Sequence, residues 1–256
     1  MPAASLAARN LVSPTVLAAE QIKSYKEEGY VLLRGLLAPA DAKAMHDEVL
    51  SIMDKIGLPL TSLKQSMDYL EGGAIDGLVN SPHLLALAAQ LMEGPSTLYM
   101  PFTAVKSGGG GGRFHFHQDN QYTRFDGPGL NMWCALQPMS LRNGCLQFVP
   151  KSHLAGTLDS IESADKGHRR IKWDPSDFVS IDMQPGDCVA FSRLTIHGSC
   201  PNQTPEPRVG YAVQFHRDDV NARREDGSWK SLKQFPRYRT GPVKEITVPK
   251  GKLEGH

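Results

Sequence analysis

Residues 116–120 read Phe-His-Gln-Asp-Asn, and the interpretation of the whole chain starts from this stretch. His117 and Asp119 are two positions apart, and on a β-strand such residues project from the same face. Two imidazoles and one carboxylate are the protein ligands of the facial triad that holds non-haem Fe(II) and leaves coordination positions open. Because a His-x-Asp pair is common by chance, the prediction of an iron site requires a second histidine elsewhere.

That second histidine is predicted in Thr195-Ile-His-Gly-Ser199, which precedes the apolar, strand-like stretch Arg208-Val-Gly-Tyr-Ala-Val-Gln-Phe215. We predict that His117, Asp119 and His197 are the metal ligands and the catalytic centre. The arginine that opens the strand carries a guanidinium fork, which matches carboxylate geometry with two charge-assisted hydrogen bonds. The His-x-Asp pair, the distal histidine and the arginine together indicate an iron site much more specifically than the His-x-Asp pair alone.

Four stretches of the chain resemble the phytanoyl-CoA dioxygenase family of Fe(II)/2-oxoglutarate oxygenases. They are residues 116–120, 143–153 (Asn-Gly-Cys-Leu-Gln-Phe-Val-Pro-Lys-Ser-His), 184–187 (Gln-Pro-Gly-Asp) and 195–202 continuing to Arg208. The opening Glu28-Gly-Tyr-Val-Leu-Leu-Arg-Gly-Leu36 is similar as well, so the resemblance runs from about residue 20 to residue 217. The chain departs from the family at Lys151, usually glycine, and in the run of five glycines at 108–112.

The resemblance implies that the cofactors are Fe(II), 2-oxoglutarate as co-substrate, and O2. It implies a dioxygenase that hydroxylates or otherwise oxidises an unactivated C–H bond of a small molecule, with release of succinate and CO2. It also implies that Arg208 holds the distal carboxylate of 2-oxoglutarate. Trp133 corresponds to an aromatic residue that borders this cofactor in the family, and Ser199 and Asn131 are further cofactor-binding candidates.

The substrate side of the pocket is predicted from strand alternation and from the polar residues after the metal motif. If Arg208 points into the barrel, every second residue after it lies on the same inner face. The polar stretch 120–124 indicates a small polar or anionic substrate. The alternative to substrate contact for Gln214 and His216 is that they are buried in the core with their hydrogen bonds satisfied there. The predicted substrate contacts are Tyr122, Arg124, Gln214 and His216.

His115 leaves the ligand set open, because on an unbroken strand it shares a face with His117 and Asp119. Three alternatives stay open for His115: a further metal ligand, a part of the pocket wall, or a structural residue. A cupin-type metal enzyme would begin its ligand set with the two histidines and usually adds a glutamate a few residues on, yet no glutamate follows until Glu162. The other alternative is a non-catalytic metal- or ligand-binding member of the same fold. A halogenase is disfavoured by the carboxylate at position 119.

Apolar residues at three- and four-residue spacing predict helices at 17–28 and 39–56. Ser81-Pro82 has the pattern of an N-cap followed by proline at the first helical position, which predicts a third helix over 84–91. After Gly94-Pro95 the turn signals and β-branched residues change the pattern to strands. These strands are predicted at 97–106, 113–119, 130–138, 145–149, 178–183, 187–193 and 208–217.

This order predicts a mainly β protein with flanking helices (α+β) and a single barrel-like sheet. With the family resemblance, the core is expected to be a double-stranded β-helix, which is a jelly-roll, cupin-like fold. We expect one domain over residues 1–256, with N-terminal helical support at about 15–93, the β-helix core at about 97–217 and a C-terminal tail at 218–256. The glycine run is a lid or a hairpin end, and the long loop 154–177 is expected to cover the substrate.

The net charge of +1 offers no strong field that would attract nucleic acid or an anionic membrane. The apolar runs are too short to span a bilayer. Four scattered cysteines without a C-x-x-C pair indicate reduced thiols and a cytoplasmic location. We therefore expect a small-molecule substrate, no nucleic-acid or membrane partner, and a monomer or small homo-oligomer.

Overall fold

The computed structural model describes residues 10–56, 63–64, 67–163, 168–232 and 243–245, and its core is built from two antiparallel sheets. The larger sheet has the strand order β1-β10-β5-β12-β3-β2, and the smaller has the order β4-β11-β6-β9. Apart from β2 and β3, strands that follow one another in the chain are not adjacent in either sheet, as in the predicted jelly-roll core. The expected single sheet is therefore corrected to two facing sheets.

The larger sheet contains the long strands. Its two longest strands, β12 (Arg208–Arg217) and β3 (Ser96–Lys106), are antiparallel neighbours over the whole of β12, with a bulge between Gln214 and Phe215. The other strands of this sheet are β1 (Tyr30–Leu33), β10 (Cys188–Ser192), β5 (Gly129–Ala135) and β2 (Leu63–Lys64).

The smaller sheet consists of short strands. They are β4 (Phe114–His117), β11 (His197–Ser199), β6 (Leu146–Phe148) and β9 (Val179–Ser180). β11 was not among the predicted strands, because its sequence His-Gly-Ser carries no β-branched or aromatic residue. The predicted strand 113–119 is shorter than expected, since β4 ends at His117 and Asp119 begins the 3-10 helix η1 (Asp119–Gln121).

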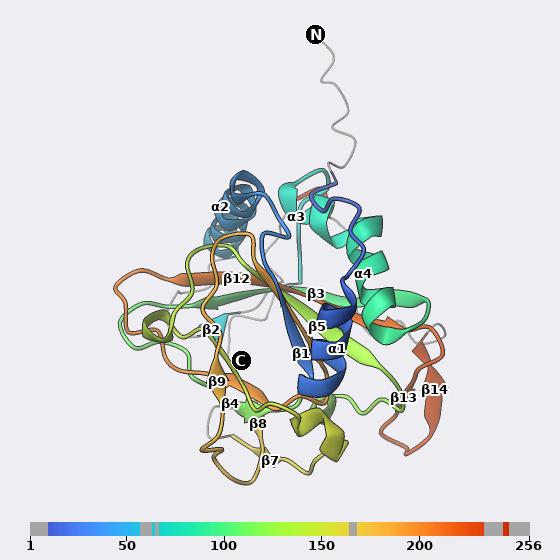
Figure 1. The fold of residues 1–256 in the computed structure, drawn as a ribbon. Coiled ribbons are helices and arrows are strands. Elements are labelled where there is room, and N and C mark those ends of the chain that lie inside the picture. The colour runs from blue at the N-terminus through green and yellow to red at the C-terminus, as the bar shows by residue number, and fades with distance from the viewer. Residues whose placement is uncertain (1–9, 57–62, 65–66, 164–167, 233–242, 246–256) are drawn as a thin grey trace.

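Helices cover one side of the larger sheet. In Figure 1, α2 (Pro39–Lys55), α3 (Ala74–Val79) and α4 (Pro82–Met92) gather on one side of β3 and β12, while β4 and β9 lie on the other. Ser81 caps α4, as predicted, by accepting a hydrogen bond from the Leu84 amide at 3.3 Å. α1 (Ala19–Glu28) ends at Gly29, whose φ of 85° is the left-handed conformation that glycine adopts freely.

β12 separates two apolar clusters and so confirms the predicted strand alternation. Val209, Tyr211, Val213 and Phe215 pack with the helices in one cluster, whereas Ala212 packs with Trp133 in the space between the sheets. The residues of β12 on the same face as Ala212 therefore point into the space between the two sheets. A ligand cavity between two sheets lies in this space. The alternation makes β12 the element that positions most of the site.

Two short hairpins complete the described part. β7 (Ile161–Glu162) pairs with β8 (Arg169–Arg170) in the long loop, and β13 (Asn221–Arg223) pairs with β14 (Trp229–Ser231) in the C-terminal segment. The rest of the predicted tail lies mostly outside the described residues. Within the described ranges, no helix is both long and apolar enough to cross a bilayer.

The glycine run is fixed by backbone hydrogen bonds to a neighbouring loop. The amide of Gly109 donates to the Thr204 carbonyl at 2.8 Å, and that of Gly110 to the Asn202 carbonyl at 2.7 Å. A Cβ at Gly108 would lie 2.0 Å from the carbonyl oxygen of Pro205, so this approach requires glycine. The glycine run is therefore a turn anchored to the neighbouring loop. None of residues 108–112 lines the cavity described below.

Candidate metal centre and cofactor pocket

His117, Asp119 and His197 form the one group of at least three potential metal ligands found among the described residues. One ligand atom from each lies within 4.8 Å of the others. His117 ends β4, Asp119 follows it in η1, and His197 begins β11, which is the antiparallel neighbour of β4 and places His197 directly opposite His117. The smaller sheet therefore delivers both histidines to one point.

Backbone carbonyls fix both imidazoles in the orientation that a metal needs. Nδ1 of His117 donates to the His115 carbonyl at 2.8 Å, and Nδ1 of His197 donates to the Thr195 carbonyl at 3.0 Å. With Nδ1 protonated, Nε2 carries the lone pair. The Nε2 atoms lie 3.9 Å and 3.7 Å from the same oxygen, Oδ1 of Asp119. Donors that lie about 2.1 Å from one ion and at right angles to each other are about 3 Å apart, so these side chains need to close by about 1 Å or less to hold a metal.

Burial keeps the His117 imidazole available as a neutral ligand. Burial and the adjacent His197 lower the pKa of His117 to about 3. A metal ligand must be deprotonated, and a neutral imidazole meets this requirement at neutral pH.

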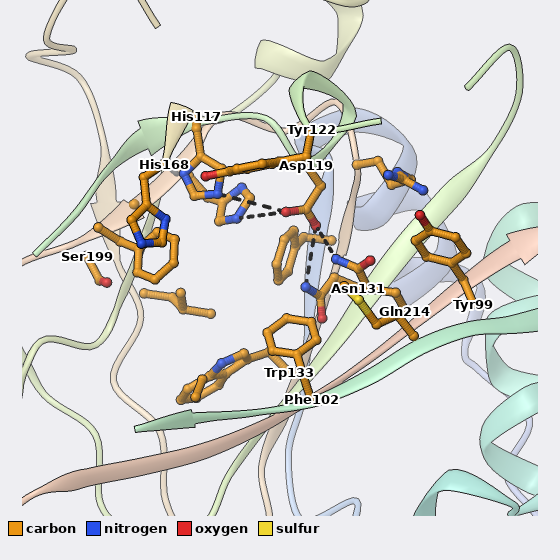
Figure 2. A pocket seen from close by; sticks show the side chains of 18 of the residues that line it. Tyr99, Phe102, His117, Asp119, Tyr122, Asn131, Trp133, His168, Ser199 and Gln214 are labelled. Atoms are coloured by element: carbon orange, nitrogen blue, oxygen red, sulfur yellow. Dashed lines mark hydrogen bonds and ion pairs between the residues drawn. The ribbon is translucent and has the colours of Figure 1, made fainter. Parts of the chain in front are cut away.

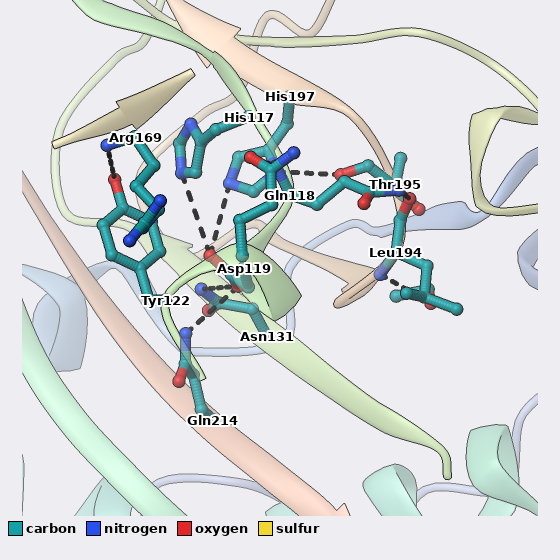
Figure 3. Close-up of polar contacts among 12 residues, drawn as sticks. His117, Gln118, Asp119, Tyr122, Asn131, Arg169, Leu194, Thr195, His197 and Gln214 are labelled. Atoms are coloured by element: carbon teal, nitrogen blue, oxygen red, sulfur yellow. Dashed lines mark hydrogen bonds and ion pairs between the residues drawn. The ribbon is translucent and has the colours of Figure 1, made fainter. Parts of the chain in front are cut away.

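The second carboxylate oxygen of Asp119 is held from the larger sheet. Oδ2 accepts a hydrogen bond from Nε2 of Gln214 at 3.1 Å and lies 3.4 Å from Nδ2 of Asn131 (Figure 3). Oδ1 is thereby left facing the histidines. Gln214 and Asn131 were predicted as substrate and cofactor contacts, and the structure places both against the carboxylate as well as in the cavity wall.

A bulge settles the position of His115. His197 pairs with His117 but Ser199 pairs with Phe114, so β4 contains one residue more than β11 over this interval. The extra residue rotates the strand, and Phe114 faces the cavity in the place that an unbroken strand would give to His115. His115 takes no part in the metal-ligand cluster and supplies its carbonyl oxygen to His117.

Gln118 points away from the cluster, as predicted, and anchors the loop that covers it. Its Nε2 donates to the carbonyls of Leu194 at 2.6 Å and Gly156 at 2.9 Å, while its Oε1 accepts from the Leu158 amide at 2.8 Å. These bonds join the metal motif to both the predicted cover loop and the segment before His197. The same loop brings His168 into the cavity wall.

A cavity of about 430 Å³ lies next to the cluster. Figure 2 shows Ser199 and His168 on one side of Asp119, Tyr99 on the other, and Trp133 with Phe102 opposite. The lining is a mixture of aromatic side chains and a few polar groups, which is typical of small-molecule sites. Of the predicted site residues, the wall includes His117, Asp119, His197, Arg208, Trp133, Ser199, Asn131, Tyr122 and Gln214.

At one end of the cavity, Arg208 is buried beside Trp133. Its guanidinium carbon lies 5.1 Å from the centre of the Trp133 ring, and NH1 donates to the Gly144 carbonyl at 3.3 Å. Nε is buried without a hydrogen-bond partner. A Cβ at Gly210 would lie 2.1 Å from the Trp133 ring, so glycine is needed for the tryptophan to lie here. A buried cation with an unused donor fits an anionic ligand.

Lys106 is a second basic residue beside Arg208 that sequence reasoning missed, and it is not among the residues that line the cavity. It is fully buried, pairs with Arg208 across β3 and β12, and donates from Nζ to the Cys200 carbonyl. Burial and the neighbouring Arg208 lower the pKa of Lys106 to about 6. The signal in the sequence was a lysine at the end of an apolar strand, but recognising it required the register that places it opposite Arg208.

The predicted substrate contacts are placed in different surroundings. Tyr122 lines the cavity with its ring 5.6 Å from that of His117, and its hydroxyl accepts a hydrogen bond from the Arg169 amide. Arg124 is exposed and does not line the cavity. His216 lies behind the wall, where it contacts Arg193. Arg193 does line the cavity and was not predicted, because its neighbours Ser192 and Leu194 carry no motif.

The sequence matches the model of the family described as Phytanoyl-CoA dioxygenase (PhyH) over residues 25–210. A methylphosphonate hydroxylase of Gimesia maris is 29% identical over 172 residues, which are 66% of this chain and 64% of that protein. The peroxisomal phytanoyl-CoA dioxygenase of Homo sapiens is 26% identical over 80% of this chain and 70% of its own length.

A similar fold is found in EvdO2 from Micromonospora carbonacea var. aurantiaca, crystallised with 2-oxoglutarate. The TM-score is 0.68 at 18% identity, and the match covers 80% of this chain and 92% of that one. The family model spans the metal cluster, the strands from β1 to β11, and Arg208 at the start of β12. This chain belongs to the phytanoyl-CoA dioxygenase family of non-haem iron, 2-oxoglutarate-dependent oxygenases.

Proposed function

We propose that the chain holds Fe(II) through His117, Asp119 and His197 and oxidises an unactivated C–H bond of a small molecule with O2. The observation that carries this proposal is the orientation of both imidazoles by backbone carbonyls, which directs their Nε2 atoms toward one oxygen of Asp119. When bound, iron and 2-oxoglutarate supply O2 activation, with 2-oxoglutarate converted to succinate and CO2.

The residues around the cluster position the carboxylate of Asp119. Gln214 and Asn131 hold Oδ2 of Asp119, so the carboxylate offers its other oxygen to the ion and leaves the remaining positions accessible from the cavity. Such outer hydrogen bonds fix the direction and basicity of a ligand.

Arg208 and Lys106 bind the distal carboxylate of 2-oxoglutarate in this proposal, with Trp133 and Ser199 as walls. The acceptors observed for both buried side chains are backbone carbonyls, so an anion would stabilise the Arg208 guanidinium and the charged form of the Lys106 amine. Their attraction is strong because the site is shielded from water. The carboxylate of Asp119 does not neutralise these two side chains, since it contacts Gln214 and the two histidines.

The experiment is to purify the protein without oxygen, add Fe(II) and 2-oxoglutarate, and record the visible spectrum. Chelation of 2-oxoglutarate to the iron gives a weak metal-to-ligand charge-transfer band, and an Asp119→Ala variant should lose it. Absence of the band in folded, iron-loaded wild-type protein would favour the non-catalytic binding member. The cupin-type alternative is weakened because His115 lies outside the ligand cluster.

We further propose a single-domain, cytoplasmic protein that acts as a monomer or small homo-oligomer on a small-molecule substrate. The support is the near-neutral charge and four free cysteines, three of them buried. Light scattering of the purified protein measures its mass. An oligomer of many subunits, or binding to nucleic acid during purification, would contradict this part of the proposal.

A further inference from the structure

Two side-chain amides of the larger sheet face the cavity beside the metal cluster. Asn131 of β5 and Gln214 of β12 lie directly opposite each other in antiparallel register, and both line the cavity. Their NH2 groups point to Oδ2 of Asp119, at 3.4 Å from Asn131 and 3.1 Å from Gln214 (Figure 2). An ionised carboxylate only accepts hydrogen bonds, so each amide must turn its nitrogen toward Asp119 and its oxygen away from it.

The oxygen of Asn131 is a buried acceptor without a partner. The residue is 3% exposed, and its Oδ1 accepts no hydrogen bond. Leaving a buried acceptor unpaired is costly, and such atoms are rare in folded proteins. Among the described residues, Oε1 of Gln214 has no hydrogen-bond partner either, since the contact of this amide with Asp119 uses its nitrogen. Both oxygens are therefore available to accept hydrogen bonds from a bound molecule.

The cross-strand neighbours of the two amides cannot supply the missing donors. Phe191 of β10 lies opposite Asn131, and Met100 of β3 lies opposite Gln214. Both neighbours line the cavity, and neither side chain carries an N–H or O–H group. The row of four residues across the larger sheet thus has two hydrogen-bond acceptors at its centre and apolar side chains at its ends.

The next inward-facing row of the larger sheet is aromatic and apolar. Ala212 of β12 lies opposite Trp133 on one side and Phe102 on the other, and both rings line the cavity. A ligand group that reaches the two amide oxygens is therefore surrounded mainly by apolar side chains. Hydrogen bonds are stronger in such surroundings than in water.

We infer that the amide oxygens of Asn131 and Gln214 accept hydrogen bonds from the substrate, which carries a hydroxyl or ammonium group close to the oxidised carbon. The inference rests on the proposed function. Because the amide of Asn131 contacts the carboxylate of Asp119, a donor bound to its oxygen lies beside the metal cluster. A carboxylate or phosphonate is disfavoured at this place, since it would face amide oxygens and Asp119, which are all acceptors. An alcohol or amine with an apolar frame fits both the amides and the aromatic wall.

The test uses the full-length protein loaded anaerobically with Fe(II) and 2-oxoglutarate. Cyclohexanol is the hydroxyl probe, cyclohexylamine is the ammonium probe, and methoxycyclohexane is the match that has an oxygen but no donor. Binding is followed as the change in the charge-transfer band on titration. We expect at least one donor probe to bind about tenfold more tightly than the ether, because the ether leaves the buried acceptors unpaired. The tighter donor probe identifies the group.

Asn131→Leu and Gln214→Leu should each reduce this preference severalfold, because leucine cannot accept a hydrogen bond. The decisive quantity is the ratio of the donor and ether affinities, since a displaced Asp119 would change the binding of both probes alike. Gln203→Leu, which removes an exposed amide outside the cavity, is the matched control and should keep the wild-type ratio. Circular dichroism checks that each variant is folded, and Asn131→Ala serves if the leucine variant is not.

The inference would be overturned if the ether bound as tightly as both donor probes, or if neither donor probe bound. A wild-type ratio in both leucine variants would overturn it as well. Absence of the charge-transfer band in wild type, before any probe is added, would instead defeat the proposed function.

Discussion

The two sheets that enclose the cavity contribute different parts of the candidate site. β12 and β3 of the larger sheet have 10 and 11 residues, whereas the strands of the smaller sheet have two to four. Both histidines of the cluster come from the short strands, while Arg208, Trp133 and Gln214 come from the long ones. The larger sheet, which is covered by helices, therefore fixes the distances between the cofactor-binding residues. The short strands place the two histidines of the cluster at their ends.

Asp119 connects the two sheets, because its turn follows β4 and its carboxylate is held by Gln214 of β12. The comparison predicts that changes on the short strands remove the metal while the fold persists. Changes on the long strands should instead weaken cofactor binding or stability. Each prediction below tests this division, beginning with the largest effect.

Replacing Asp119 by alanine should abolish Fe(II) binding and turnover, because two imidazoles alone leave the ion without its only charged ligand. Metal content after desalting and succinate release are the measurements. Unfolding by heat, followed without metal, should change little, since the strands of both sheets are untouched. Asp126→Ala, which removes an exposed carboxylate of the same segment, is the control. Retention of stoichiometric iron by the Asp119 variant would show that the cluster is not the metal site.

Replacing Arg208 by methionine should raise the dissociation constant of 2-oxoglutarate by roughly a hundredfold, since hydrogen bonds between charged groups contribute about 1.5–3 kcal/mol. Iron binding should persist, because Arg208 is not a member of the metal-ligand cluster. Titration of the charge-transfer band gives both quantities. An unchanged 2-oxoglutarate affinity would remove the proposed role of this end of the larger sheet.

Gln214→Leu tests whether the larger sheet controls the metal through Asp119. Residues that hold a metal ligand typically affect metal affinity or activity by about 10- to 100-fold. We expect iron affinity to fall within that range while the 2-oxoglutarate affinity of the iron-loaded protein changes less. If Gln214 acts only on the substrate, iron affinity will stay at the wild-type value and only the KM for substrate will rise.

The long strands were largely predictable from the sequence, and the details of the short ones were not. The prediction for β12 was correct at both ends, and that for β3 differed by one residue, because long apolar runs are a strong local signal. The three members of the metal-ligand cluster were also predicted, from the His-x-Asp spacing and the second histidine before an apolar strand. Their geometry was predicted on an unbroken strand, whereas Asp119 lies in η1 and a bulge moves His115. Bulges and short turns depend on pairing partners that are distant in sequence.

The same reason explains the cations that were missed. Lys106 becomes part of the site only through its register with Arg208, and Arg193 only through its contact with His216. Conversely, Arg124 was predicted from its closeness to the metal motif, yet η1 ends the inward-facing stretch and leaves it exposed. Closeness in sequence to the metal motif therefore did not predict which residues line the cavity after the backbone turns at η1.

Lys106 provides a pH-dependent test of the cofactor end. Its pKa of about 6 lies below its usual value, so in the ligand-free protein this amine is mostly neutral above pH 6. A bound carboxylate favours the charged form, and binding of 2-oxoglutarate at pH 7–8 should therefore take up close to one proton. Calorimetry in buffers of different ionisation enthalpy measures this uptake. Lys106→Met should abolish it and weaken binding about tenfold, whereas equal uptake by both proteins would exclude Lys106.

Gly210→Ala is the mildest change, because it adds one methyl group to the long strand and removes no polar contact. The new Cβ would lie 2.1 Å from the Trp133 ring, so either the tryptophan or the strand must shift. Overpacking of this kind costs about 1–3 kcal/mol, which should appear as a lower melting temperature. Since Trp133 lies beside Arg208, 2-oxoglutarate affinity should fall severalfold while iron binding is unchanged. A variant that loses stability but binds 2-oxoglutarate normally would separate the packing role of Trp133 from its proposed place beside the cofactor.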